Sequence, residues 1–576
     1  MKAGDICIRA LNQYRHYDVL AYLGLRYYLN NSAARSDLWA QKLATDVVLT
    51  RAEAPYLLSQ QFKEFDDEGK IKHRDIYIPG PNEALAEIAL LSACAKYEAF
   101  SNPEYVFSYS LNKRDRKGAY LGYMEGLTSR HRAIAEACNL CQNGVVAYTD
   151  IKSFYPSIMT DLAVTVWNKN CDTSGISEIY RSLGDRLIHD HGRANGSISP
   201  HILIGPMFSH FVANLILREL DEEFVKLPVK YFRYVDDITL VGEREKITAS
   251  TKIIRERLKQ RFNLELHDDD SPKSITIPSH EWLKGKEDFN QNNVSHSWMT
   301  FAADLKRFLL FNPESYEIIR EKFIENGFRI PFRNYNAAIQ ERDYTDRIIY
   351  LFKKQWFRRK LSSISIGDLM LRATSIRNEC DAKFRELLRN ANTLTGFNRK
   401  RCIPKLRYCA GRLIYLATDD TLASLSILAR EIPELHLHAE VMMAVSSGNI
   451  DGILPLGVNV AQVAAQPLKA AEKQCRLTKE FLTPSEQHAL SVFFLNGINV
   501  SQVSTPGECS DILRFATNGA DISLMRQTDN PVLREIACLH GVGGPRHSAC
   551  LETAFDIDEE LAMDAIEQPW QSCPAW

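Results

Sequence analysis

Residues 230–242, with the sequence KYFRYVDDITLVG, are the most informative stretch of the chain. Aromatic and β-branched residues flank Asp236 and Asp237 on both sides, which is the composition of two short strands. The segment therefore predicts a β-hairpin that carries two adjacent carboxylates at its tip. Neighbouring carboxylates repel each other, and an ordinary hairpin turn more often contains Asn-Gly or Asp-Gly. A bound cation would offset the repulsion, and hard oxygen ligands suit Mg²⁺ or Mn²⁺.

A third carboxylate lies upstream, at the end of a second strand-like segment. Residues 145–149 are apolar enough to form a buried strand, and this strand leads directly into Asp150. Aromatic residues and a proline follow, which is not the pattern of a packed core. Because a buried and unpaired aspartate is costly, Asp150 needs a cation or a hydrogen-bonding partner.

Length and composition limit the class of protein. A chain of 576 residues is long enough for several domains, and 45% hydrophobic and 25% charged residues are typical of a soluble globular protein. The net charge of −2 excludes a polycation, so any nucleic-acid surface must be local. The sequence has no apolar run that could cross a membrane and no signal-peptide pattern. The 13 scattered cysteines indicate free thiols in a reducing cytoplasm.

The remaining segments give a coarse outline of secondary structure. Residues 1–70 have helical periodicity, residues 105–111 alternate like a strand, and residues 282–285 have the composition of a tight hairpin. From about residue 298 the pattern is again helical. Two basic stretches are candidates for nucleic-acid contact. They are the loop with Lys113, Arg114, Arg116 and Lys117, and the segment Phe352 to Lys360.

The motifs occur in a specific order along the chain: strand and Asp150, then Gly205-Pro206 and Ser209 at the start of a helix, then the Asp236-Asp237 hairpin, then Lys273. This order resembles the palm of a reverse transcriptase. The resemblance implies an α+β right-hand polymerase, with fingers, a ferredoxin-like palm and a helical thumb, followed by an α-helical C-terminal extension. The implied regions are an N-terminal helical region at 1–70, fingers and palm at 71–300, a thumb at 301–390 and a C-terminal helical domain at 391–576.

The resemblance also implies a chemistry, that of an RNA-directed DNA polymerase. In this chemistry two Mg²⁺ ions about 3.5–4 Å apart activate the attacking hydroxyl and stabilise the leaving pyrophosphate. Mn²⁺ is the alternative ion. By the resemblance, the metal ligands are Asp150, Asp236, Asp237 and the Ile151 carbonyl, and Lys273 protonates the pyrophosphate.

By the same resemblance, Tyr155, Gly205 and Ser209 bind the nucleotide. In reverse transcriptases an aromatic residue at the place of Tyr155 blocks the ribose 2′-hydroxyl, so dNTPs are the expected substrates. RNA-dependent RNA polymerases usually place aspartate there. The alternative interpretation of Tyr155 is a core aromatic residue.

One difference from the usual reverse transcriptase motif points to a particular group within the family. Many reverse transcriptases have Leu-Pro-Gln-Gly before the helix, whereas Ile204 replaces the glutamine here. Together with the long helical extension, the pattern Ile204-Gly205-Pro206-x-x-Ser209 resembles bacterial defence-associated, abortive-infection reverse transcriptases. The missing glutamine leaves open whether synthesis is templated, untemplated or protein-primed.

These observations lead to one leading hypothesis and two alternatives. The leading hypothesis is a cytoplasmic DNA polymerase of anti-phage defence. Its expected partners are dNTPs, RNA or DNA (including a structured non-coding RNA), and a second reverse transcriptase or further copies of itself, with no membrane. The first alternative is a binding module that acts mainly through the helical domain. The second is an RNA-dependent RNA polymerase. The sequence leaves the template, the primer and the oligomeric state open.

Overall fold

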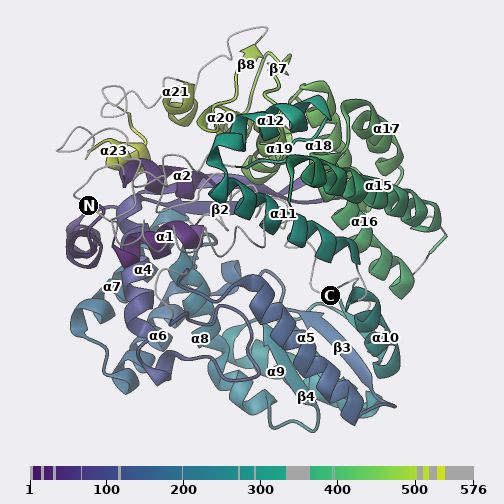
Figure 1. Ribbon diagram of the computed structural model, residues 1–576. Coiled ribbons are helices and arrows are strands. Elements are labelled where there is room, and N and C mark those ends of the chain that lie inside the picture. Colours follow the sequence, from purple (N-terminus) through teal and green to yellow (C-terminus); the bar gives the residue numbers. More distant parts are fainter. Residues whose placement is uncertain are drawn as a thin grey trace.

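The computed structural model describes most of the chain and shows a mixed α+β protein (Figure 1). Within the described part, no helix is both long enough and apolar enough to span a membrane. The described residues are 4–14, 19–29, 34–66, 68–113, 118–196, 199–269, 271, 273–290, 293–332, 364–391, 393–394, 396–502, 510–517 and 528–538.

The centre of the lower part in Figure 1 is a four-stranded antiparallel sheet. Its strands, in spatial order, are β4 (Lys230–Tyr234), β5 (Asp237–Gly242), β3 (Val145–Asp150) and β6 (Ile275–Pro278). Alternate residues along a strand point to opposite faces, and both faces are covered. Val146 and Val241 pack with residues of α5 (Tyr123–Leu140) and α10 (Ser279–Asn290). Val145 and Leu240 belong to the larger core on the other face, with α8 (Met207–Phe224) and α9 (Arg244–Phe262).

A long antiparallel hairpin lies next to this region. It consists of β1 (Tyr56–Phe65) and β2 (Ile71–Pro79), with a register shift between Phe62 and Glu64. The prediction that residues 1–70 are all helical is therefore wrong for β1. The helices around the hairpin are α1 (Asp5–Tyr14), α2 (Val19–Tyr28), the π-helix η1 (Trp39–Leu43), α3 (Ala44–Thr50) and α4 (Pro81–Cys94).

Two further local predictions are also wrong. Residues 282–285 lie inside helix α10, where the Trp282 indole donates a hydrogen bond to the Tyr148 hydroxyl (2.7 Å) and thereby holds the helix against the sheet. Residues 105–111 make only isolated bridges, Val106 with Arg233 and Leu111 with Tyr120, instead of forming a strand. The segments that connect the motifs are η2 (Glu98–Phe100), η3 (Tyr155–Ser157), α6 (Thr160–Ser174) and α7 (Glu178–Ala194).

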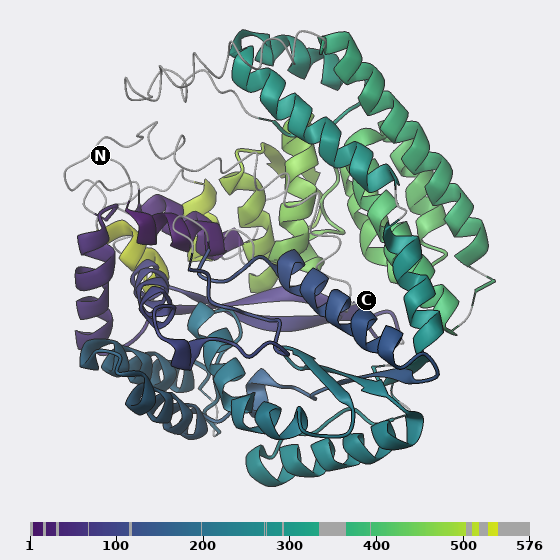
Figure 2. The same ribbon diagram turned by 60° about the horizontal axis from the view of Figure 1, so that its bottom comes forward.

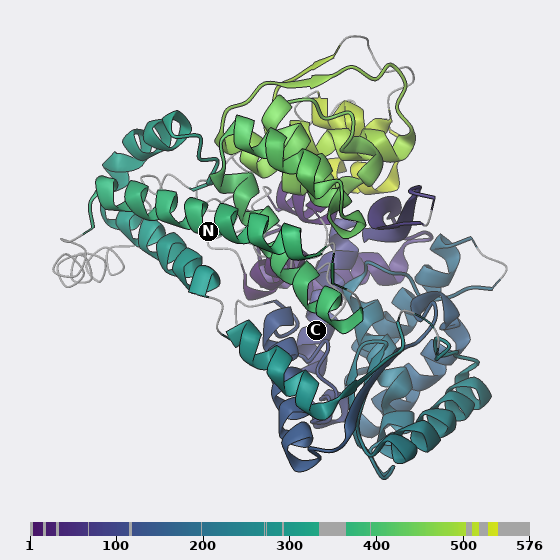
Figure 3. The ribbon, with the colours of Figure 1, turned by 90° about the vertical axis from the view of Figure 1, so that its right-hand side faces the viewer.

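The second half of the described chain is mostly helical, as the periodicity predicts. Helices α11 (Asn293–Phe311), α15 (Ile366–Ala391) and α16 (Gly396–Leu416) lie side by side (Figure 3). A small parallel pair, β7 (Cys475–Leu477) with β8 (Val500–Gln502), is the exception. The elements are α11 (Asn293–Phe311), η4 (Pro313–Ser315), α12 (Tyr316–Glu325), α15 (Ile366–Ala391), α16 (Gly396–Leu416), α17 (Asp419–Ala429), η5 (Pro433–Leu435), α18 (His436–Ser447), η6 (Leu454–Leu456), α19 (Val458–Ala470), α20 (Pro484–Leu495), α21 (Asp511–Thr517) and α23 (Pro531–Cys538).

The C-terminal helices α19, α20 and α23 pack directly on the β1–β2 hairpin. In Figure 2 the purple hairpin lies between the green helices and the four-stranded sheet. Gln61 of β1 forms a β-bridge with Gly457, and the Phe62 amide donates to the Asn459 side chain (3.3 Å). On β2, the His73 ring is hydrogen-bonded to the Pro455 carbonyl at 2.7 Å. Residues far apart in sequence therefore hold this hairpin.

Candidate active site

The antiparallel pairing of β3 with β5 places Asp150 opposite Asp237. Asp236 precedes Asp237 in the turn, and one carboxylate oxygen from each of the three residues lies within 4.8 Å of the other two. The prediction that Asp150 meets the tip of the hairpin is confirmed. All three donors are carboxylates, the ligand type that Mg²⁺ and Mn²⁺ prefer.

The turn between β4 and β5 depends on an unusual backbone conformation. Val235 has φ +55°, a left-handed conformation that β-branched residues rarely adopt. Its amide donates to the Ser108 hydroxyl (2.8 Å), and its carbonyl accepts from Arg233 (2.9 Å). Arg233 is buried and also pairs with Asp221 of α8 at 2.6 Å. The hairpin tip is therefore fixed by contacts with the core below it.

The three carboxylates disfavour one another's charge. Burial, followed by the charges of Asp150 and Asp237, raises the pKa of Asp236 well above its usual range. Burial also raises the pKa of Asp237 to about 6, although the nearby Arg130 and Lys273 act in the opposite direction. Divalent cations placed among these oxygens would offset both the burial and the repulsion, so the residues fit the metal pair that the motif implies.

Three basic side chains surround the carboxylates. The Lys273 ammonium lies 2.9 Å from Oδ2 of Asp150, and His267 Nε2 lies 3.6 Å from the same oxygen. The role of Lys273 as a proton donor to pyrophosphate stays a prediction. Behind the tip, the fully buried Arg130 of α5 places Nη1 3.9 Å from Oδ2 of Asp237. Its guanidinium also stacks 5.3 Å from the centre of the Tyr234 ring.

Arg74 of β2 is a site residue that the sequence did not single out. It is exposed, and its positive charge opposes the rise that burial causes in the pKa of Asp236 and adds to the lowering that burial causes in the pKa of His210. It therefore lies close enough to both groups to act on their charge. An exposed arginine near a cluster of carboxylates that could hold a metal ion is suited to bind a phosphate.

Tyr155 lies in η3, five residues after Asp150, and is mostly buried. Its hydroxyl forms a hydrogen bond with Nδ1 of His210 on α8. The His210 ring is in turn stacked on Tyr109, with 4.3 Å between ring centres and 4° between planes. The predicted sugar-contacting aromatic residue is thus part of an aromatic stack, and neither His210 nor Tyr109 was predicted.

The other predicted nucleotide-binding residues have structural contacts. Gly205 has φ +124°, and a Cβ at this position would lie 2.3 Å from the Tyr77 carbonyl. Ile204 accepts a hydrogen bond from the Tyr77 amide (2.8 Å), so the turn pairs with β2. Ser209 is fully buried, and its hydroxyl lies 3.4 Å from Nδ1 of His191. The structure therefore places the Ser209 side chain in the core, and its contact with a nucleotide stays a prediction.

Of the remaining predicted residues, Ile151 and Lys113 lie within the described part of the chain. The Ile151 amide donates to the Asp236 carbonyl at 3.2 Å, which fixes the backbone between the carboxylates, while its role as a metal ligand stays a prediction. Lys113 is exposed. The rest of its basic loop, residues 114–117, and the basic segment 352–360 lie outside the described residues.

Comparison with known proteins does not assign this chain to a family. No protein-family model matches the chain, and no curated protein matches it.

Proposed function

We propose that this chain is a metal-dependent nucleotidyltransferase of the reverse transcriptase type, which makes DNA from dNTPs. The observation that carries the proposal is the meeting of Asp150, Asp236 and Asp237 at the end of one strand and the tip of the neighbouring hairpin. Lys273, His267 and Arg130 near these carboxylates support it, as does the buried Tyr155 five residues after Asp150.

In this proposal Asp150, Asp236 and Asp237 hold two divalent ions. When bound, the ions activate the primer hydroxyl and neutralise the charge that develops on the phosphates. Lys273 gives a proton to the leaving pyrophosphate. Burial opposes the charge of Lys273, but its hydrogen bond to Asp150 gives a net rise in pKa, so the side chain carries the required proton at neutral pH. Arg74 binds the triphosphate from the β2 side, and Tyr155 faces the sugar.

The defence role forms part of the same proposal. It is supported by the resemblance of residues 204–209 and of the long helical extension to abortive-infection reverse transcriptases. A protection assay in bacteria that carry the gene tests this role separately from the chemistry.

The decisive experiment measures nucleotide incorporation by the purified chain with Mg²⁺ or Mn²⁺. The double substitution Asp236→Asn, Asp237→Asn should abolish incorporation, because the site loses two of its three carboxylates. The matched control is Asp268→Asn, Asp269→Asn, since these exposed acids pair with Lys152 and Arg255 instead. Full activity in the first variant would rule out the metal assignment. Phage protection without incorporation would favour the binding-module alternative.

A second readout does not depend on activity. In a chelating buffer Asp236→Asn should melt at a higher temperature than the wild type, because it removes one of three mutually repelling carboxylates. Mg²⁺ should then raise the melting temperature of the wild type more than that of the variant. Equal responses to Mg²⁺ would contradict a metal centre at this position.

A further inference from the structure

His210 has contacts that go beyond filling space in helix α8. Its Nδ1 is joined by a hydrogen bond to the Tyr155 hydroxyl, and the two rings meet edge to face, 5.3 Å apart and at 89°. One face of the His210 ring is stacked flat on the Tyr109 ring. One imidazole therefore connects η3, which follows β3, to the loop that contains Tyr109, more than forty residues upstream.

The far side of this stack is also fixed. Tyr109 has φ +47°, an unusual conformation for a non-glycine residue, and its ring packs edge to face on Tyr120 at 5.2 Å. The Tyr120 hydroxyl donates to the Met207 carbonyl in the first turn of α8 (2.7 Å). The chain of contacts thus starts and ends on α8, so the Tyr155 ring cannot swing without displacing several buried groups.

The proposed function places the Tyr155 end of the stack near the carboxylates. Tyr155 follows Asp150 by five residues, and the charge of Arg74 reaches both His210 and Asp236. In the proposed function, a nucleotide whose phosphates lie at the carboxylates has its sugar near Tyr155.

We propose that His210 is a positioning residue for sugar selection, which holds Tyr155 rigid so that the space for the nucleotide cannot widen to accept a 2′-hydroxyl. This inference rests on the proposed function and adds to it the residue that keeps the Tyr155 ring in place. A steric barrier discriminates only when it does not yield, and the hydrogen bond and the stacking oppose its movement from two directions.

The test compares the kcat/KM for dNTPs with that for NTPs in four forms of the full chain: the wild type, Tyr155→Phe, His210→Phe and the double variant. His210→Phe keeps an aromatic ring against Tyr109 and removes the hydrogen bond, and Tyr155→Phe removes the same bond from its other end. Each single variant should lower the preference for dNTPs about tenfold, mainly by raising the use of NTPs. The double variant should lower it no further, because both substitutions remove one interaction.

The control is His438→Phe, in which another buried histidine, on α18, is replaced in the same way. It should leave the preference for dNTPs unchanged. A purely structural role of His210 would reduce the use of both nucleotide classes together, whereas the positioning role changes their ratio. If His210→Phe folds poorly, Tyr155→Phe alone still removes the hydrogen bond and decides the question.

Two outcomes overturn the inference, and they can be told apart. An unchanged preference in both single variants, with dNTP incorporation intact, contradicts the role of His210 and leaves the proposed polymerase standing. A wild-type chain that incorporates neither nucleotide class contradicts the proposed function itself, and the inference with it.

Discussion

At the scale of single residues, the position of the carboxylates depends on Val235. A β-branched residue in the left-handed region costs on the order of 1–3 kcal/mol, and it persists only where neighbouring contacts hold it. Ser108 supplies one such contact through the Val235 amide, and Arg233 supplies another through the Val235 carbonyl. Asp236 and Asp237 follow immediately, so the strained residue and the proposed metal ligands form one unit.

We therefore expect Ser108→Ala to weaken both stability and incorporation. The Val235 amide would lose its partner, which should lower the free energy of unfolding by about 1–2 kcal/mol. Incorporation should fall because the turn that carries Asp236 is less well fixed. Denaturant titration measures the change in stability. Incorporation assays with and without a primer measure the change in activity.

Thr248→Ala on the exposed face of α9 is the control, since its hydroxyl donates only within its own helix. Adding Val235→Gly to Ser108→Ala should restore part of the stability, because glycine adopts φ +55° without strain. If Ser108→Ala and Thr248→Ala behave alike, the tip is not held in the way proposed.

At the scale of elements, helices α4 and α8 meet at one buried carboxylate. Glu87 of α4 accepts hydrogen bonds from the Phe208 amide in the first turn of α8 (3.0 Å) and from the Tyr14 hydroxyl (3.3 Å). A negative charge is favoured at a helix N-terminus, yet complete burial is the larger effect and raises the pKa of Glu87 from 4.5 to about 7.

This pKa predicts a pH-dependent stability. The folded state binds the Glu87 proton more tightly than the unfolded state, so the stabilisation is fully present below pH 4.5 and is lost as the pH rises to about 7. The loss from this one group should be roughly 3 kcal/mol. Glu87→Gln should flatten the profile in this window, as measured by denaturant midpoints from pH 4.5 to 7.5. The exposed Glu245→Gln should leave the profile unchanged, and a Glu87→Gln profile as steep as the wild type would contradict the prediction.

The elements that the sequence predicts correctly are those with a strong local pattern. The hairpin at 230–242 and the strand before Asp150 combine apolar alternation with a clear turn. Strand β1 was missed because its mixed sequence does not alternate cleanly, and it is held partly by Gly457 and Asn459, about 400 residues away. Residues 282–285 were predicted to be a hairpin but belong to α10. This helix is held against the sheet by Trp282, a contact that the local sequence does not show.

The same division applies to the candidate site. Asp150, Asp236 and Asp237 were found because they lie at the ends of recognisable strand-like segments, and Lys273 was found through the resemblance alone. Arg74, Arg130 and His210 carry no such local signal. The packing of α5 and β2 brings Arg130 and Arg74 close enough to act on the carboxylates, and the packing of α8 brings His210 to Tyr155. No pattern within a single segment could therefore have identified them.

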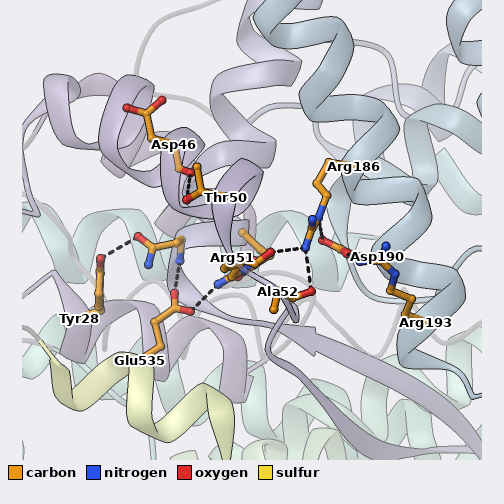
Figure 4. A network of polar contacts seen from close by, with 11 residues as sticks. Tyr28, Asp46, Thr50, Arg51, Ala52, Arg186, Asp190, Arg193 and Glu535 are labelled. Atoms are coloured by element: carbon orange, nitrogen blue, oxygen red, sulfur yellow. Dashed lines mark hydrogen bonds and ion pairs between the residues drawn. The ribbon is translucent and has the colours of Figure 1, made fainter.

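At the scale of the whole molecule, the C-terminal helices and the N-terminal region are joined at two places. The first is the contact of residues 455–459 with the β1–β2 hairpin, which also carries Arg74. The second is the polar network of Figure 4, where Glu535 of α23 accepts from Arg51 (3.0 Å) and from the Asn82 amide (2.6 Å). Arg186 of α7 extends this network through the Arg51 carbonyl. The helical extension thus supports the hairpin that carries Arg74.

This arrangement predicts that a change in the C-terminal region alters nucleotide binding. Gly457 has φ +88°, and a Cβ there would lie 2.5 Å from the Gln60 carbonyl of β1. Gly457→Ala should push the hairpin away from α19 and shift Arg74, so the KM for the nucleotide should rise several-fold while kcat changes less. The backbone strain and the clash together should cost about 2–4 kcal/mol of stability.

Gly497→Ala separates the clash from the strain. Gly497 has a similar φ of +76°, but a Cβ there meets no described atom within 4 Å. It should therefore lose only the backbone contribution, about 1 kcal/mol, and keep the KM of the wild type. A rise in KM confined to Gly457→Ala would show that contact with the C-terminal helices positions the hairpin. Equal KM values in the two variants would mean that the hairpin holds its position without contact with the C-terminal helices.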